Sequence, residues 1–397
     1  MEEELIKRSL GLFHDMKNGI EQEKLVKQAR DIFKVIEDSP LEKSISFDDV
    51  EDVFRMTSVS LDKALQSISD EEFVIYFKSE VLTTKTYDFF FPVYCFYGFP
   101  NGFKLGYSTA IDFDRMPPEI REYFGFLWEH RFTIDTEYHR TKDEYITLKK
   151  RTAFVHLIVK ANGHFKAIEN ARSLAEDALH IIRFLYQINL NIIDIRYKIR
   201  ENKNEGGIEG IAVLPFVGGA NFSKFLEEHI PILTDIFTKS NPNEIEKKIR
   251  NALRIFGIQK SMSNDQVRFV LLITCLESLL MTASDRDYIL WKLAEQAAFF
   301  LGGDRRETNE YVRSAYGKRS AFVHGSTSKD GLVTRSDIDS AEELAVGLVW
   351  KLIDFMKKGY TSIQKHNNAK SIDEYIEEAK FGKHQEPKEI HKNHTSN

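Results

Sequence analysis

An arginine and a histidine in the last third of the chain have the spacing of a pair that could cleave RNA. Arg319 and His324 stand at the two ends of the hexapeptide RSAFVH, with Gly317 before it and Gly325 after it. RNA carries its own nucleophile, the 2′-hydroxyl, so its cleavage requires proton transfer and stabilised negative charge on the phosphate. Histidine transfers protons near neutral pH, and the planar guanidinium of arginine matches phosphate oxygens. The pair therefore predicts phosphodiester cleavage that requires no metal ion.

The same spacing occurs a second time, between Arg151 and His156, and a lysine precedes the arginine in both copies. The spacing alone therefore does not identify the functional copy. The residues from 145 to 159 are rich in β-branched side chains and partly alternate in polarity, which is typical of a strand. No glycines bracket this copy. We interpret Arg319 and His324 as the candidate catalytic pair and the earlier copy as a decoy.

The elements that must position these residues change in character along the chain. Residues 1–37 predict two helices, and residues 164–188 predict one long amphipathic helix. Between them, two aromatic runs at 89–97 and 103–113 flank Asn101-Gly102, which predicts a β-hairpin. Further strands are expected within 131–160 and 192–199, and a short helix after Pro117.

Beyond residue 239 every ordered segment is predicted to be helical. Ser263 with Gln266 indicates a capping box for one helix, and Ser336 with Asp339 indicates another. Gly317 is expected to end a helix just before the RSAFVH segment. The expected helices from residue 222 onward are 222–237, 246–258, 263–281, 287–301, 307–316, 336–358 and 372–380.

These patterns predict an α+β protein, in which a mixed α/β region with antiparallel β-hairpins is followed by an all-α helical bundle. Residues 1–205 are expected to form a mixed sensor or regulatory domain, and 206–242 a connecting segment with one helix. Residues 243–381 are expected to form the bundle. Residues 382–397 are polar and poor in apolar side chains, and are predicted to be a disordered tail.

The composition is typical of a globular protein and gives no general signal for nucleic acid. Hydrophobic residues make up 42% and charged residues 29%, and the net charge is −6. This acidic balance argues against a non-specific nucleic-acid coat protein, but it leaves room for a small local RNA site.

Targeting and redox features favour a reducing cytoplasm. The acidic N-terminus is unlike a signal peptide, and the apolar run 267–281 is too short and too charged to span a bilayer. Cys95 and Cys275 are far apart in apolar surroundings, so we expect two buried thiols rather than a disulfide or a zinc site. No metal site, cofactor or membrane partner is predicted.

Three segments of the C-terminal third carry a resemblance to a known family. They are LESLL at 276–280, the run 289–300 and YGKRSAFVHG at 316–325. In this order and spacing they resemble the HEPN superfamily, in particular its Apea-like branch. The residue after the arginine is often Asn, His or Asp in the wider superfamily. Here it is Ser320, which the Apea-like branch tolerates.

The resemblance implies a helical bundle that pairs with a second copy, so that the arginine and histidine of both protomers meet in one cleft. Residues five apart on a helix differ by about 140° in direction, so Arg319 and His324 do not share a face. A symmetric pair of copies can still complete the site. The resemblance makes His324 the general acid/base and Arg319 the phosphate clamp, with a 2′,3′-cyclic phosphate and a 5′-hydroxyl as products.

Two neighbouring side chains are supporting candidates with alternatives left open. Glu277 could orient Arg319, but it could equally form a structural salt bridge or face solvent. Lys318 could touch an RNA phosphate, or it could be a solvated charge. Ser320 is included because it directly follows the arginine.

Two functions remain open at this point. One is a metal-independent endoribonuclease that acts on single-stranded RNA or tRNA loops, a chemistry that members of this family often use in bacterial antiviral defence. Its partners would be RNA and a second copy of the chain, and the N-terminal region would respond to an unknown trigger. The other is a non-catalytic module that binds a nucleotide, RNA or a partner protein, which the acidic charge favours. The intact pair of Arg319 and His324 favours the nuclease.

Overall fold

The protein, described here by a computed structural model, divides into two compact units. The structure describes residues 2–18, 21–37, 39–59, 68–93, 96–97, 103–112, 116–118, 121, 153–187, 195–199, 205–208, 220–221, 228–282, 285, 288–325, 332–364 and 370–380. The first unit comprises 1–176 and 192–216, and the second comprises 177–191 and 217–397. The division falls inside helix α7 (His164–Tyr186) and differs from the boundaries at 205 and 242 that the sequence predicts.

The second half of α7 groups with the C-terminal helices because it is bonded to them. Both carboxylate oxygens of Asp177 accept hydrogen bonds of 2.7 Å from the guanidinium of Arg254. Phe184 packs edge-on against Phe256, with 5.4 Å between ring centroids. A long amphipathic helix is predicted at this place and is confirmed, but its sequence gives no sign that its two halves have different partners.

The first unit begins with helices whose apolar faces share one core. Phe13 and Phe73 stack at 4.2 Å between ring centroids, and both are buried. The two helices predicted within residues 1–37 are confirmed. The helical elements are α1 (Glu2–Lys17), α2 (Gln22–Glu37), the 3-10 turn η1 (Pro40–Lys43), α3 (Phe47–Val59), α4 (Asp70–Phe77) and the π-helical segment η3 (Lys78–Leu82).

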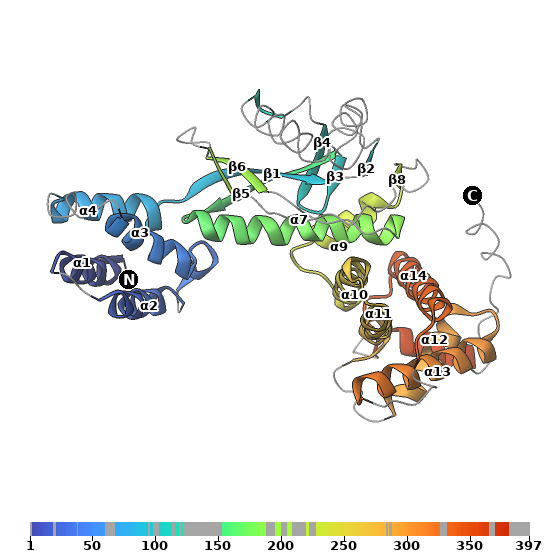
Figure 1. Cartoon of the computed structure of the whole chain (residues 1–397). Helices are drawn as coiled ribbons and strands as arrows, with labels where there is room; N and C mark the ends of the chain where they lie inside the picture. The colour runs from blue at the N-terminus through green and yellow to red at the C-terminus, as the bar shows by residue number, and fades with distance from the viewer. Residues whose placement is uncertain are drawn as a thin grey trace, which may run out of the picture. The chain divides into compact units, whose positions relative to one another are not determined.

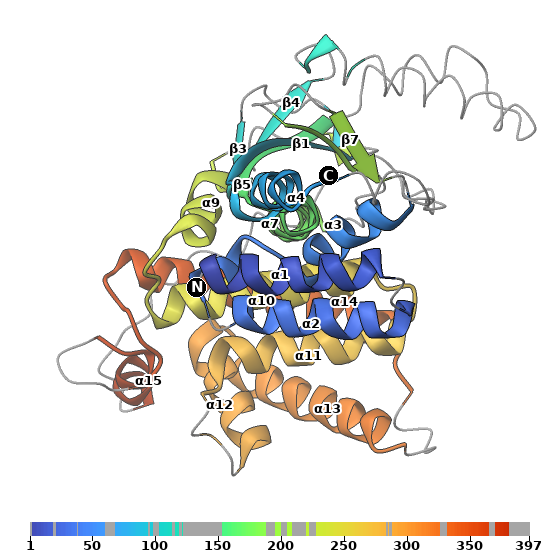
Figure 2. The same ribbon diagram turned by 90° about the vertical axis from the view of Figure 1, so that its left-hand side faces the viewer.

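An antiparallel sheet follows, with the strand order β3-β4-β5-β1-β6-β7. Strand β1 lies inside the sheet between β5 and β6, and its three consecutive phenylalanines, 89–91, are buried. The first half of α7 runs along one face of the sheet (Figures 1 and 2). The strands of this sheet are β1 (Lys85–Val93), β3 (Phe103–Leu105), β4 (Ser108–Asp112), β5 (Ala153–Ala161), β6 (Ile195–Ile199) and β7 (Glu205–Ile208). The short strands β2 (Phe96–Tyr97) and β8 (Ala220–Asn221) are not part of it.

The hairpin predicted between the two aromatic runs is wrong, because neither β1 nor β2, the two strands of the first run, is a neighbour of β3. The hairpin lies within the second run, where β3 pairs with β4 and Leu105 pairs with Ser108. The two-residue turn begins with Gly106, whose φ is 60°. Glycine adopts this φ without steric penalty, as the first central position of a type II′ turn requires. Residues 101–102 and 122–152, where a turn and further structure are predicted, lie outside the described residues.

The second unit is a helical bundle in which α11 lies at the centre. It packs against α10, α12, α13 and α14, and its inward leucines are fully buried. The helices are α9 (Ile230–Thr238), α10 (Glu244–Ser261), α11 (Asp265–Leu280), α12 (Ile289–Leu301), α13 (Arg305–Val323), α14 (Arg335–Lys357) and α15 (Ile372–Lys380). The coarse α+β layout is thus confirmed. Within the described parts of the chain, no helix is both long and apolar enough to cross a membrane.

Two helices of the bundle begin at residues other than the predicted caps. Helix α11 is capped by Asn264 rather than Ser263, and the side-chain oxygen of Asn264 accepts the N–H three residues on at 3.0 Å. Helix α14 is capped by a reciprocal box of Thr334 and Asp337, rather than one begun by Ser336. In both places several residues with capping side chains lie close together, and the sequence does not rank them.

His180, in the second half of α7, is a buried histidine that packs tightly against α10. A Cβ added at Gly257 would lie 2.0 Å from Nδ1 of the ring, so only glycine fits there. Burial, followed by the positive charges of Arg183 and Arg254, lowers the pKa of His180 to about 3. The native protein therefore holds this ring neutral through the whole range in which a free histidine takes up a proton.

This ring should make stability depend on pH. Between pH 6.5 and 3 the unfolded chain binds a proton that the native state excludes, so the free energy of unfolding falls as the pH falls. At pH 5 the expected loss from this group is about 2 kcal/mol relative to pH 7.5. Urea unfolding of wild type and His180→Gln at both pH values measures it. Equal losses in the two proteins would assign the pH dependence to other groups.

Candidate active site

The RSAFVH segment forms the end of α13, and the helix does not stop before it. Asp304 caps the start by accepting the N–H groups of Arg306 and Glu307, both at 3.0 Å. The helix then continues through Gly317, so the prediction that this glycine ends it is wrong. A glycine inside a helix costs only about 1 kcal/mol relative to alanine, which packing elsewhere can offset. The terminating glycine is Gly325, with a φ of 70°.

His324 is the C-terminal cap of this helix. Its backbone N–H donates to the carbonyl of Ser320 at 3.0 Å, which is how Ser320 contributes to the local geometry. The side chain of His324 is exposed. Among the described residues, none forms a hydrogen bond or ion pair with its ring. The imidazole is therefore open to solvent.

Arg319 points toward α11. Its Nη2 lies 3.6 Å from Oε2 of Glu277, and the two side chains are 25% and 20% exposed. Its Cζ lies 5.6 Å from the centre of the Tyr316 ring. The Nε atom is buried and has no hydrogen-bond partner among the described residues. The guanidinium is thus held by one ion pair, while part of its donor capacity stays unused.

Glu277 contacts two residues of α13. It forms an ion pair with Arg319, and its negative charge acts on the phenol of Tyr316. Burial first, and then the charge of this carboxylate, raise the pKa of Tyr316. Of the alternatives predicted for Glu277, the structure shows the carboxylate paired with Arg319 rather than facing solvent. This pairing fits both the orienting role and the structural salt bridge.

Lys318 forms an ion pair with a carboxylate of the next helix. Its Nζ donates to both oxygens of Asp337 at 2.7 and 2.8 Å, and this carboxylate also belongs to the capping box of α14. The lysine therefore ties α13 to the start of α14, rather than presenting a solvated charge. Asp337 was not among the predicted site residues, although the spacing Thr334-x-x-Asp337 is a recognisable signal for a capping box.

The second Arg-x4-His copy lies in a different setting. His156 is part of β5, so the predicted strand is confirmed from residue 153 onward, and its part before 153 lies outside the described residues. Its Nε2 lies 2.9 Å from Oδ1 of Asp88, and its ring stacks on Phe90 with 4.9 Å between centroids. Both partners belong to the neighbouring strand β1. His156 is therefore part of a strand-to-strand pairing, and Arg151 lies outside the described residues.

Cys275 is buried in α11, and burial raises the pKa of its thiol to about 12, which confirms the expected buried thiol. Cys95 lies outside the described residues, as do the histidines of the tail. Within the described ranges, no three His, Cys, Asp or Glu side chains form a group that could hold a metal ion.

Comparisons with known proteins do not extend the interpretation. No family model matches the chain, and neither the curated proteins nor the solved structures give a match. The resemblance to the HEPN superfamily therefore rests on the three motif segments, and a function has to be argued from the site itself.

Proposed function

We propose that this chain is a metal-independent endoribonuclease of the HEPN type, which cleaves single-stranded RNA or tRNA loops through the 2′-hydroxyl. The observation that carries the proposal is the arrangement at the end of α13. There, His324 is exposed five residues after Arg319. The Nε atom of Arg319 is buried and has no hydrogen-bond partner among the described residues. These two side chains match the two requirements of the reaction, which are proton transfer and charge stabilisation.

In the proposed reaction, His324 removes the proton from the 2′-hydroxyl, and the oxygen attacks the adjacent phosphorus. The bond from phosphorus to the 5′-oxygen breaks, and this oxygen takes up a proton from a second histidine, which acts as the acid, and leaves as a 5′-hydroxyl. Arg319 stabilises the negative charge that grows on the non-bridging oxygens. The other product is a 2′,3′-cyclic phosphate, so all atoms and protons balance without a co-reactant.

A second copy of the chain fits this scheme. The reaction uses one base and one acid, and two copies would supply two histidines. Within one chain Arg319 faces Glu277, about 140° around the helix from the direction of His324. We infer that a homodimer through the C-terminal bundle completes the site. The N-terminal unit is proposed to respond to a trigger, and the activity to act in the cytoplasm as bacterial antiviral defence.

The test is an assay of product ends. Wild type and an Arg319→Ala/His324→Ala double variant are incubated with total tRNA and with a labelled single-stranded RNA in EDTA. Cleavage by wild type alone, with 2′,3′-cyclic phosphate ends and no cleavage at 2′-deoxy positions, is expected. Equal cleavage by both proteins, or 3′-hydroxyl ends, would contradict the proposal. If neither protein cleaves, cellular toxicity of wild type that the double variant lacks distinguishes an untriggered nuclease from a binding module.

The Glu277→Gln variant tests whether this carboxylate positions Arg319. We expect kcat to fall roughly 10- to 100-fold with KM little changed, because a misdirected guanidinium acts mainly in the transition state. The matched control is Lys318→Met, which breaks another ion pair of α13, on the side of α14. Steady-state kinetics that show the same loss in both variants would indicate a general effect on the helix instead.

A further inference from the structure

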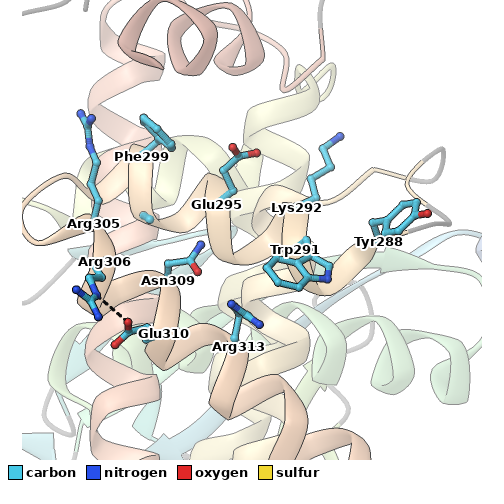
Figure 3. A pocket seen from close by; sticks show the side chains of 11 residues that line it. Tyr288, Trp291, Lys292, Glu295, Phe299, Arg305, Arg306, Asn309, Glu310 and Arg313 are labelled. Carbon is cyan, nitrogen blue, oxygen red and sulfur yellow. Dashed lines mark hydrogen bonds and ion pairs between the residues drawn. The ribbon is translucent and has the colours of Figure 1, made fainter. Parts of the chain in front are cut away.

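A groove of about 680 Å³ lies between α12 and α13, separate from the Arg319 and Glu277 pair. Figure 3 shows aromatic and cationic side chains from both helices around it. The aromatic residues that line it are Tyr288, Trp291 and Phe299. Two of them are unusually exposed for their size, with 81% of Tyr288 and 53% of Trp291 accessible to solvent. Aromatic rings left open in this way provide surfaces on which a planar group can stack.

Arginines accompany two of these rings. The Cζ of Arg313 lies 3.8 Å from the centre of the Trp291 ring, and the Cζ of Arg305 lies 4.5 Å from that of Phe299. Alternating aromatic and guanidinium planes are the usual platform for unstacked bases, because bases stack on both kinds of surface. The arrangement is therefore more specific than a cluster of positive charge.

The charge of the groove is opposite to that of the chain. Four cations line it against two carboxylates, although the net charge of the whole protein is −6. Lys292 and Arg306 have carboxylate partners, Asp285 at 2.5 Å and Glu310 at 2.9 Å. Arg313 has no ion pair among the described residues. Its charge is thus available to a phosphate next to the exposed indole.

One face of α13 leads from this groove to His324. On an ideal helix, positions 317, 320 and 324 lie within about 40° of the direction of Arg313, and His324 is about 16 Å further along the axis. Gly317 lies midway and is exposed, and nothing is found within 4 Å of the position of an added Cβ. The path between groove and histidine is therefore not blocked by a side chain at this position.

We propose that the α12–α13 groove binds the single-stranded RNA that flanks the cleaved bond, with a base stacked on Trp291 and a phosphate on Arg313. The strand then follows the face of α13 over Gly317 to His324. This inference rests on the proposed function for its substrate, and it adds where the substrate is held. It accounts for an aromatic and cationic surface on a protein that is acidic overall.

The experiment measures RNA affinity without cleavage. A fluorescein-labelled 12-nucleotide RNA without secondary structure is titrated with the full chain carrying His324→Ala, and anisotropy is recorded. In this background Trp291→Ala is expected to weaken binding about 5- to 100-fold, the effect of one lost base stack. Trp291→Phe should retain most of the affinity. Arg313→Ala should weaken binding and reduce its dependence on salt.

Two further variants test the path and the role of charge. Gly317→Gln places a side chain in open space on the path, so affinity should fall while the melting temperature stays the same or rises. Arg335→Ala removes one positive charge outside the groove, on the exposed start of α14, and should leave affinity unchanged. Affinities equal to the parent protein for both Trp291→Ala and Arg313→Ala would overturn the proposal, as would a change of oligomeric mass on Trp291→Ala without a change in RNA affinity.

The outcomes separate this proposal from the nuclease itself. If wild type cleaves RNA but the groove variants bind RNA as tightly as the parent protein, the groove proposal is wrong and the nuclease proposal is supported. If the groove variants weaken RNA binding but wild type leaves no cyclic phosphate ends, the groove proposal is supported and the nuclease proposal is wrong. If the parent protein binds no RNA, the groove has another occupant, such as an acidic protein segment, and the proposal is wrong.

Discussion

Replacing His324 by alanine is expected to lower the rate of RNA cleavage about 10²- to 10⁴-fold, the usual contribution of a general acid or base. RNA affinity and thermal stability should change little, because the ring is exposed and none of the described residues bonds to it. The measurement is the single-turnover cleavage rate at saturating protein, which separates the chemical step from binding. A rate within a few-fold of wild type would remove His324 from the mechanism.

The chain contains its own control for this prediction. His156 has the same Arg-x4-His spacing, but it is bonded to Asp88 at 2.9 Å within the sheet. His156→Ala should therefore leave the cleavage rate unchanged and instead lower the stability of the first unit by about 1 kcal/mol, the typical net value of one hydrogen bond. If both variants lose cleavage equally, the effect comes from the fold and not from catalysis.

Replacing Glu342 by alanine is expected to produce the largest loss of stability in the C-terminal bundle. This carboxylate of α14 is 5% exposed and joins three helices. It accepts from Lys260 of α10 at 2.7 Å and from Arg268 of α11 at 2.9 Å. Gln259 donates to it at 3.2 Å. Removing the carboxylate leaves the buried ammonium of Lys260 without a negative partner, which costs about 3–5 kcal/mol, while Arg268 keeps its ion pair with the more exposed Asp265.

Urea unfolding monitored by circular dichroism measures this loss. The matched control is Asp339→Ala, one turn earlier on the same helix, where the ion pair with Arg335 is 58% exposed on the aspartate side. An exposed pair of this kind contributes at most about 1 kcal/mol. Glu342→Gln, which keeps the shape but not the charge, should fall between the two. A loss for Glu342→Ala no larger than that for Asp339→Ala would show that the buried cluster tolerates an unpaired charge.

The sequence predicts helices well and strand pairing poorly, for a physical reason. A helix is encoded by local periodicity, so α1, α2 and α7 could be predicted from their apolar spacing, whereas α3 and α4 were not predicted. A strand is paired by residues far along the chain. The partners of β1 begin at Ala153, whereas the local Asn-Gly signal suggested a partner at Phe103. The aromatic strand was predicted, and its neighbours β5 and β6 fall in segments where strands were predicted, but their pairing with β1 was not.

The candidate site divides in the same way. Arg319 and His324 lie within one hexapeptide and could be read from it, and Glu277 was named because a carboxylate on an apolar helix needs a partner. The partner of Lys318 and the α12–α13 groove were not found. Both depend on how two helices pack together. Trp291 lies in α12 and Arg313 in α13, and no sequence pattern links the two residues.

Strand β1 also has a consequence for how the protein is made. Its register pairs Val93 with Ala153 and Lys85 with Ala161, so its partner strand is synthesised 60 to 76 residues later. At about 5–20 residues per second, roughly 3–15 s pass between the appearance of the two strands. During this interval a phenylalanine-rich edge has no β5 to cover it. Growth at a lower temperature or with added chaperones should therefore raise the soluble yield of this chain more than any change at the active site.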